Sequence, residues 1–105
     1  MFTLIESLED LSYLNKEISD RSHIGIDTEF RRTSKYNIKL ALLQINDGEE
    51  IFLIDTIKIK HPESNIDFLS SGHVIKIFHS CKEDLESIYS WTQSEMVNIF
   101  DTQLA

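Results

Sequence analysis

HIGIDTEFRR, residues 23–32, is the stretch that decides how the rest of this chain is interpreted. Its apolar residues alternate as they do in a half-buried β-strand, but two acids, Asp27 and Glu29, stand one residue apart in its middle. Two like charges on such a strand cost free energy unless a cation meets them. The sequence therefore raises the question of which cation these carboxylates bind.

Strand geometry places both carboxylates on the same face. Side chains alternate along a strand, so Asp27 and Glu29 share one face with Gly25, while the residues between them face the other way. The two acids lie about 6 to 7 Å apart along the strand. Hard divalent cations such as Mg²⁺ and Mn²⁺ prefer oxygen ligands of this kind. The alternative is a pair of surface acids on an edge strand, because a D-x-E pattern alone is common.

A third carboxylate, that of Asp84, is expected to reach the same place. The segment HVIKIFHS, residues 73–80, is typical of a strand, and the S-x-x-E spacing of Ser80 and Glu83 predicts a capping box with a helix starting at Ser80. Asp84 then lies in the first helical turn, and in open α/β sheets strand ends and helix starts line the functional crevice. The alternative is that Asp84, like Glu83, only complements the helix dipole.

The remaining periodicity predicts a mixed α/β sheet with flanking helices. The second and third strands are separated by a short loop whose Asp47-Gly48 step favours a hairpin, so the first three strands should form an antiparallel meander. The last two strands flank a helix, so they should be parallel with a right-handed crossover. The expected strands are 24–30, 39–45, 51–55, 73–80 and 97–100, and the expected helices are 8–19, about 65–70, and one from Ser80.

Composition is that of one globular domain. The 105 residues include 41% hydrophobic residues and a single proline, which is typical of a packed core. No apolar run approaches the ~18 residues of a membrane span, and residues 1–14 lack the features of a signal peptide. One cysteine, Cys81, agrees with a reducing compartment. We therefore expect a cytoplasmic protein without a membrane partner.

The charge distribution leaves room for an anionic partner. The net charge of −8 argues against nucleic acid, which is normally bound by Lys and Arg. Residues 31–40 nevertheless carry cations and no acid, directly after the carboxylate pair. A phosphate can be drawn to this segment; the alternative is a solvated loop whose cations balance nearby acids. The cations are Arg31, Arg32, Lys35 and Lys39.

Other chemistries lack their motifs. The chain has no dinucleotide-binding G-x-G-x-x-G, no P-loop and no G-x-S-x-G. His79 and Cys81 are poorly placed to act as base and nucleophile, and no structural zinc spacing is present. Carboxylate chemistry is therefore the best supported reading of the residues.

Three segments resemble the motifs of ribonuclease D, a family in the DEDD superfamily of 3′-5′ exonucleases. IGIDTEFRR with the following LALLQI resembles the first motif, whose acids fall on Asp27 and Glu29. FHSCKEDLESI resembles the second, with its catalytic Asp on Asp84. IFDTQLA resembles the D-T-Q segment at 101–103. The resemblance runs over the whole chain in the right order.

The resemblance implies a fold and an activity. The fold is a ribonuclease H-like five-stranded mixed sheet of order 3-2-1-4-5 with flanking helices, truncated at the C-terminus. The activity is metal-dependent 3′-5′ exoribonuclease action on a single-stranded RNA 3′ end, in processing of tRNA or other structured RNA. Two divalent ions, Mg²⁺ or Mn²⁺, would be held by Asp27, Glu29 and Asp84. For the basic segment we expect phosphate contacts by Arg31, Arg32 or Lys35.

Residues 1–105 are expected to be the amino-terminal part of an exonuclease domain. The family's third motif supplies a Tyr and a fourth Asp beyond the D-T-Q segment, and this sequence stops before it. Asp101 reads as the N-cap of a helix whose first turn ends the sequence, and not as the fourth ligand. The third motif and any downstream nucleic-acid-binding domain are thus absent, and this segment alone is expected to be inactive.

Two other functions remain open from the sequence. One is a non-catalytic nucleic-acid-binding or interaction module on the same fold. The other is a DNA-directed exonuclease of the proofreading type, since no motif reports contacts to the 2′-hydroxyl group. No obligate protein partner can be inferred.

Overall fold

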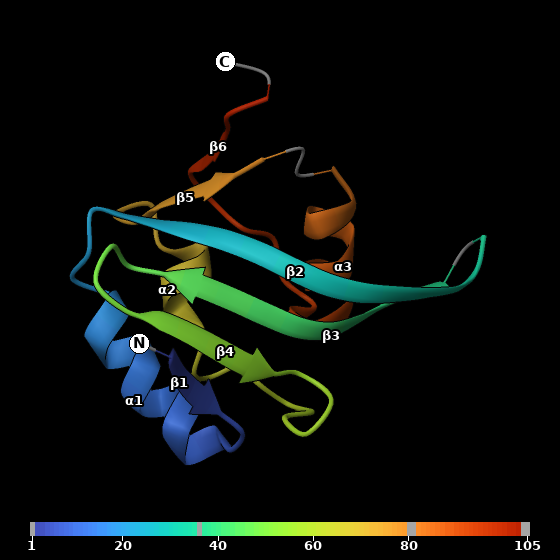
Figure 1. Cartoon of the computed structure of the whole chain (residues 1–105), viewed down its shortest axis with the longest axis horizontal. Coiled ribbons are helices and arrows are strands. Elements are labelled where there is room, and N and C mark those ends of the chain that lie inside the picture. The colour runs from blue at the N-terminus through green and yellow to red at the C-terminus, as the bar shows by residue number, and fades with distance from the viewer. Residues whose placement is uncertain (1, 36, 80–81, 104–105) are drawn as a thin grey trace.

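The strand that carries Asp27 and Glu29 lies inside a single six-stranded sheet (Figure 1). This arrangement comes from a computed structural model that describes residues 2–35, 37–79 and 82–103. The strand order is β1-β4-β3-β2-β5-β6. In chain order the elements are β1 (Phe2–Ile5), α1 (Leu8–Ile18), β2 (His23–Ser34), β3 (Asn37–Asn46), β4 (Ile51–Asp55), α2 (Asp67–Ser70), β5 (Ile75–Phe78), α3 (Lys82–Thr92) and β6 (Ile99–Asp101).

The predicted strand order is confirmed for the five expected strands. β2 pairs with β3, and β3 with β4, in antiparallel fashion, whereas β5 is parallel to both β2 and β6. The expectation of five strands was wrong by one, because β1 pairs in parallel with β4 at the sheet edge. β1 has four residues and only Ile5 is buried, so it lacks the alternation by which a strand is found in sequence.

The expected helices are present with small changes in their limits. α1 begins after Ser7, whose Oγ accepts a hydrogen bond from the Asp10 amide at 3.1 Å, as an N-cap does. Residues 65–70 contain the short α2, and α3 begins at Lys82. The capping box predicted at Ser80 lies outside the described residues. None of the described helices is long and apolar enough to cross a membrane.

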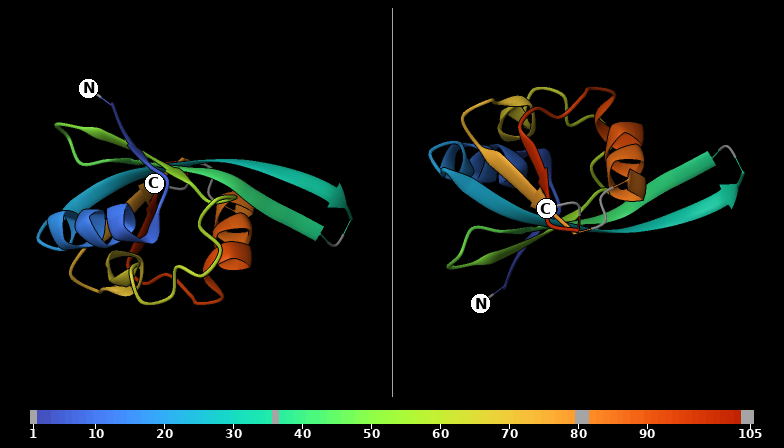
Figure 2. Two further views of the ribbon diagram at one scale, coloured as in Figure 1. Left: turned by 90° about the horizontal axis from the view of Figure 1, so that it is seen from below. Right: turned by 90° about the horizontal axis from the view of Figure 1, so that it is seen from above.

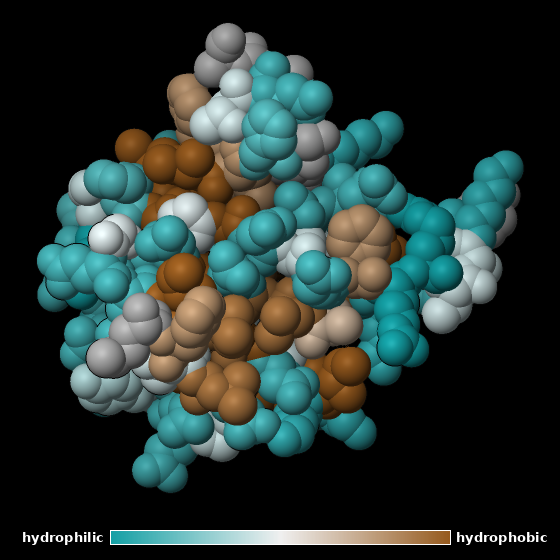
Figure 3. All heavy atoms as spheres, in the orientation of Figure 1, coloured by the Kyte–Doolittle hydropathy of each residue, from teal (hydrophilic) through white to brown (hydrophobic). Residues whose placement is uncertain are grey.

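The three helices in the described part of the chain cover one face of the sheet (Figure 2). One hydrophobic core lies between the helices and the sheet, and it includes Leu14 of α1, Phe68 of α2 and Ile88 of α3. Within the described part of the chain, no helix covers the opposite face. Apolar side chains gather in the middle of that face (Figure 3). Phe2 and Leu4 of β1 are 67% and 55% exposed. We call the face of the sheet opposite the helices the uncovered face.

A β-bulge changes the alternation in β3 where β2 and β3 leave the body of the protein as a two-stranded ribbon (Figures 1 and 2). We call the paired segments beyond the bulge, residues 30–34 of β2 and 37–40 of β3, the β2–β3 ribbon. Glu29 pairs with Leu42, but the next residue, Phe30, pairs with Leu40, so Ala41 is the extra residue. Leu40 on one side of the bulge and Leu43 on the other are both buried. The bulge therefore keeps apolar residues of both halves of β3 in the core.

Candidate active site

Asp27 lies where two neighbouring strands separate. The parallel pairing of β2 with β5 runs from His23–Ile75 to Gly25–Ile77 and ends there, two residues before Asp27. A groove of ≈ 420 Å³ opens at this point. Its lining includes Asp27 of β2, Gln44 of β3, and His79 and Thr102 beyond the ends of β5 and β6. A groove therefore lies at the strand ends beside Asp27, and its lining does not include Glu29 or Asp84.

Asp27 and Glu29 share the uncovered face, as the strand alternation predicted. Both are exposed, whereas Thr28 between them is half-buried. The two acids also border a smaller hollow of ≈ 50 Å³ together with Gln44 and Leu42. Asp27 Oδ1 accepts a hydrogen bond from the Thr28 amide at 2.9 Å. Among the described residues, neither carboxylate forms an ion pair.

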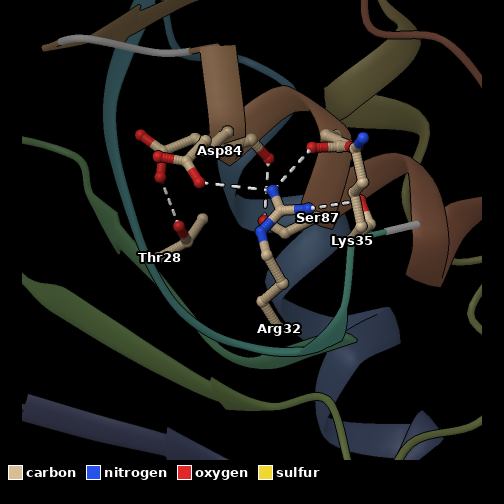
Figure 4. A network of polar contacts seen from close by, with 7 residues as sticks. Thr28, Arg32, Lys35, Asp84 and Ser87 are labelled. Atoms are coloured by element: carbon tan, nitrogen blue, oxygen red, sulfur yellow. Dashed lines mark hydrogen bonds and ion pairs between the residues drawn. The ribbon is translucent and has the colours of Figure 1, made fainter. Parts of the chain in front are cut away.

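Asp84 reaches β2 through a residue that the sequence did not single out. The Thr28 hydroxyl donates a hydrogen bond to the Asp84 carboxylate (Figure 4). Burial raises the pKa of Asp84, and repulsion from Asp27, Glu83 and Asp101 adds to this, while the Thr28 hydrogen bond opposes it. The first turn of α3 thus holds a half-buried carboxylate within electrostatic reach of Asp27.

The three predicted ligands do not form a closed cluster in this structure. Among the described residues, no three His, Cys, Asp or Glu side chains lie close enough together to hold a metal ion. Asp27 and Glu29 face the uncovered side, whereas Asp84 turns toward Thr28, which faces the helices. Their chemistry still fits a hard divalent cation, because oxygen donors accumulate here and a cation would relieve the repulsion on Asp84. Their role as ligands stays a prediction.

Gln44 is a polar neighbour of Asp27 that was not among the predicted site residues. It pairs directly with Asp27 across β2 and β3 and borders both hollows. Its amide oxygen is the kind of neutral ligand that hard cations also accept. The signal was available, because Gln44 is the one polar residue in the apolar segment LALLQI.

The structure separates the cations that were predicted to bind phosphate. Arg32 points to α3, where its guanidinium lies 3.3 Å from a Glu83 oxygen and 3.2 Å from a Glu86 oxygen (Figure 4). It also donates to the Lys35 carbonyl at 3.2 Å. These contacts, first with Glu86 and then with Glu83, raise the pKa of Arg32. Arg31, one residue earlier, faces the opposite side of the ribbon.

The D-T-Q segment joins the ends of β5 and β6. Thr102 donates its amide to the Phe78 carbonyl at 2.9 Å, and its Oγ1 lies 3.0 Å from His79 Nδ1. Asp101 Oδ1 accepts from the Gln103 amide at 2.9 Å, a contact of the kind an N-cap makes. The helix expected to follow falls on residues 104 and 105, outside the described residues.

Comparison with known proteins gives consistent matches. A 3′-5′ exonuclease family model matches residues 2–105. Ribonuclease D from Shewanella sp. (strain ANA-3) is 32% identical over 105 residues, and that from Serratia proteamaculans (strain 568) is 34% identical over 103 residues. These matches cover 100% and 98% of this chain. They cover 27% and 28% of those proteins, so this chain spans about a quarter of their length.

A solved structure agrees with the sequence relatives. Escherichia coli RNase D, described as an exoribonuclease involved in structured RNA processing, superposes with a TM-score of 0.89 and 30% identity. The superposition covers 99% of this chain and 28% of that protein. The ribonuclease H-like mixed sheet expected from the motifs is thus confirmed. Because the family model matches nearly every residue and the fold agrees, this chain belongs to the 3′-5′ exonuclease family, and ribonuclease D is among its relatives.

Proposed function

We propose that this chain is part of a metal-dependent 3′-5′ exonuclease that hydrolyses RNA from a single-stranded 3′ end. The observation that carries the proposal is the position of Asp27 and Glu29, two exposed carboxylates without an ion pair among the described residues, where β2 parts from β5. Membership of the exonuclease family supports the reaction type. The name and description of the relatives support RNA as the substrate class.

Asp27, Glu29 and Asp84 would hold the metal. Bound Mg²⁺ or Mn²⁺ ions would lower the pKa of a coordinated water and stabilise the charge on the departing 3′ oxygen. The protein's own part is to place the donors. β2 presents Asp27 and Glu29 to the uncovered face, Gln44 adds a neutral oxygen beside them, and the Thr28 hydroxyl orients Asp84.

Metal binding tests the proposal directly. Calorimetric titration of the protein that contains this domain with Mn²⁺ should give saturable heat that Asp27→Asn or Glu29→Gln strongly reduces. Glu9→Gln, which removes an exposed acid from the first turn of α1, is the matched control and should leave the titration unchanged. Titrations that are the same for the wild type and Asp27→Asn would overturn the metal-dependent reading and favour a non-catalytic module.

Nuclease assays test the reaction and the substrate. In the protein that contains this domain, release of mononucleotides from the 3′ end of labelled RNA should require Mg²⁺ or Mn²⁺ and be lost with Asp27→Asn. The same assay with DNA of equal sequence distinguishes the proposal from a DNA-directed exonuclease. Faster release from DNA than from RNA would contradict the proposed substrate class.

A further inference from the structure

Two cations face each other across the β2–β3 ribbon. Arg31 pairs directly with Lys39 in the antiparallel register, and both side chains are exposed. The bulge at Ala41 creates this pair, because without the extra residue Leu40 would lie opposite Arg31. Like charges directly opposite each other on a sheet face are destabilising. The ribbon therefore places two cations together at a free-energy cost that an anion would offset.

Neither cation is neutralised within the described part of the protein. No side-chain hydrogen bond or ion pair joins Arg31 or Lys39 to another described residue. Arg32, by contrast, is held by Glu83 and Glu86 of α3 on the other side of the ribbon. The two neighbouring arginines thus differ in their availability to a ligand.

The pair borders a groove with an apolar floor. A hollow of ≈ 320 Å³ is lined by Arg31 and Thr33 of β2, Lys39 and Ala41 of β3, and Ile57 beyond β4. Cations at the rim can contact phosphate oxygens, while Ala41 and Ile57 can pack against a ribose or base. This combination suits a single nucleic-acid strand, which proteins bind through backbone charge and sequence-tolerant contacts to the bases.

The groove lies on the same face of β2 as the candidate ligands. Arg31 follows Glu29 by two residues, so their side chains leave the strand on the same side about 6 to 7 Å apart. A strand of nucleic acid with its scissile bond at Asp27 and Glu29 can therefore continue along β2 to Arg31. On this face of β2, the acids that would face the reacting end of the nucleic acid are followed by a cation that can contact its phosphate backbone.

We propose that Arg31 and Lys39 form a phosphate-binding subsite for the nucleic-acid strand whose end is hydrolysed at Asp27 and Glu29. The inference rests on the proposed exonuclease function and adds Lys39, while it assigns Arg32 to the support of α3. Because the contact is to phosphate, the subsite takes RNA and DNA backbones alike, and any preference for RNA arises elsewhere.

Binding without hydrolysis tests the subsite separately from catalysis. Fluorescence anisotropy with a labelled oligouridine, and with the matching DNA, is measured in EDTA over a range of salt concentrations. Arg31→Gln and Lys39→Gln should each weaken binding about tenfold at low salt, the size of a lost charged hydrogen bond. Each should also lower the slope of log K against log salt by about 0.7. Lys16→Gln, on the exposed side of α1, is the control for net charge.

Equal losses with RNA and DNA, larger for Arg31→Gln than for Arg32→Gln, would support the proposal, provided that circular dichroism shows folded variants. Arg31→Gln and Lys39→Gln behaving like Lys16→Gln would overturn it, as would a loss confined to RNA or a wild type that binds neither strand. The Mn²⁺ titration of Asp27→Asn is independent of this result, so failure of the subsite and failure of the exonuclease function are distinguishable.

Discussion

The Thr28 hydroxyl donates a hydrogen bond to the Asp84 carboxylate, joining the strand of the first two acids to the helix of the third. The two residues are 56 positions apart in the sequence. Thr28 lies between Asp27 and Glu29 but points to the other face, so three consecutive residues place side chains on both faces of the sheet. The position of Asp84 therefore depends on the same strand that carries the exposed acids.

Replacing the Thr28 hydroxyl should raise the pKa of Asp84 further. Thr28→Val keeps the branched shape but removes the donor that stabilises the ionised carboxylate. Thr28→Ser keeps a hydroxyl and should leave the pKa near the wild-type value. Carboxyl-detected NMR titration of Asp84 measures both variants. A pKa that is the same in the valine variant and the wild type would show that the hydrogen bond does not orient Asp84 in solution.

Asp84→Asn should stabilise the fold at neutral pH. Burial and neighbouring acids raise the pKa of Asp84, so the folded state binds this proton more tightly than the unfolded state. Ionisation of Asp84 therefore lowers the free energy of unfolding. This loss is absent below the ordinary pKa of an aspartate, grows as the pH rises through the raised pKa, and is complete above it. Asn removes the charge and still accepts from Thr28. Urea unfolding should show a higher midpoint for Asp84→Asn at pH 7 and no difference near the acid limit; a lower midpoint at pH 7 would contradict this.

Lys76 should make stability increase with pH in the alkaline range. Its side chain is fully buried, and Nζ donates to the Ser71 and Val97 carbonyls at 2.6 and 2.9 Å. Burial lowers the pKa of Lys76 from 10.5 to about 8. Between these values the unfolded state binds more protons, so the free energy of unfolding rises with pH across that window. The rise should be smaller in Lys76→Met, measured by urea unfolding at each pH; identical pH profiles would refute the assignment.

Deleting Ala41 should destabilise the domain strongly. Without the bulge, either Leu40 or Leu43 must turn from the core to the uncovered face, because one residue of slip reverses every side chain beyond it. The expected loss is at least about 2–5 kcal/mol, the range for one buried leucine. Ala41→Ser keeps the residue count and serves as the control. Urea unfolding gives the free energy of unfolding of both variants. A deletion variant as stable as Ala41→Ser would show that the ribbon repacks.

The sequence predicted the interior of the sheet well because apolar periodicity is a local signal. The helix expected at 8–19 and the hairpin at Gly48 follow from residues close together in the chain, whereas the order of the five expected strands came from the resemblance of the motifs. β1 was missed because only Ile5 of its four residues is buried. The strand that includes Asp27 was expected to end at 30, but β2 continues to Ser34 by pairing with β3.

The candidate site was less accessible to prediction than the fold. Residues 31–35 include no apolar residue that would mark a strand, so Arg31 and Arg32 could not be assigned to opposite faces. The contact of Thr28 with Asp84 depends on the packing of α3 against β2, which no local pattern encodes. Gln44 stands out in the sequence as the one polar residue of LALLQI, but its position opposite Asp27 depends on the register between β2 and β3.

Because β2 separates from β5, the rigidity of β2 should decrease along its length. His23 and Ile24 pair with β5 and Gly25 pairs with both β5 and β3, whereas from Ile26 onward the described pairing is with β3 alone. Backbone amides with fewer neighbours open more readily, so we expect hydrogen exchange to quicken from Gly25 toward the tip of the ribbon. Asp27 and Glu29 then lie close to the end of β2 that pairs with two strands, and Arg31 lies farther out. In the proposed exonuclease, such a strand would hold the acids in place while the ribbon adjusts to the bound nucleic acid.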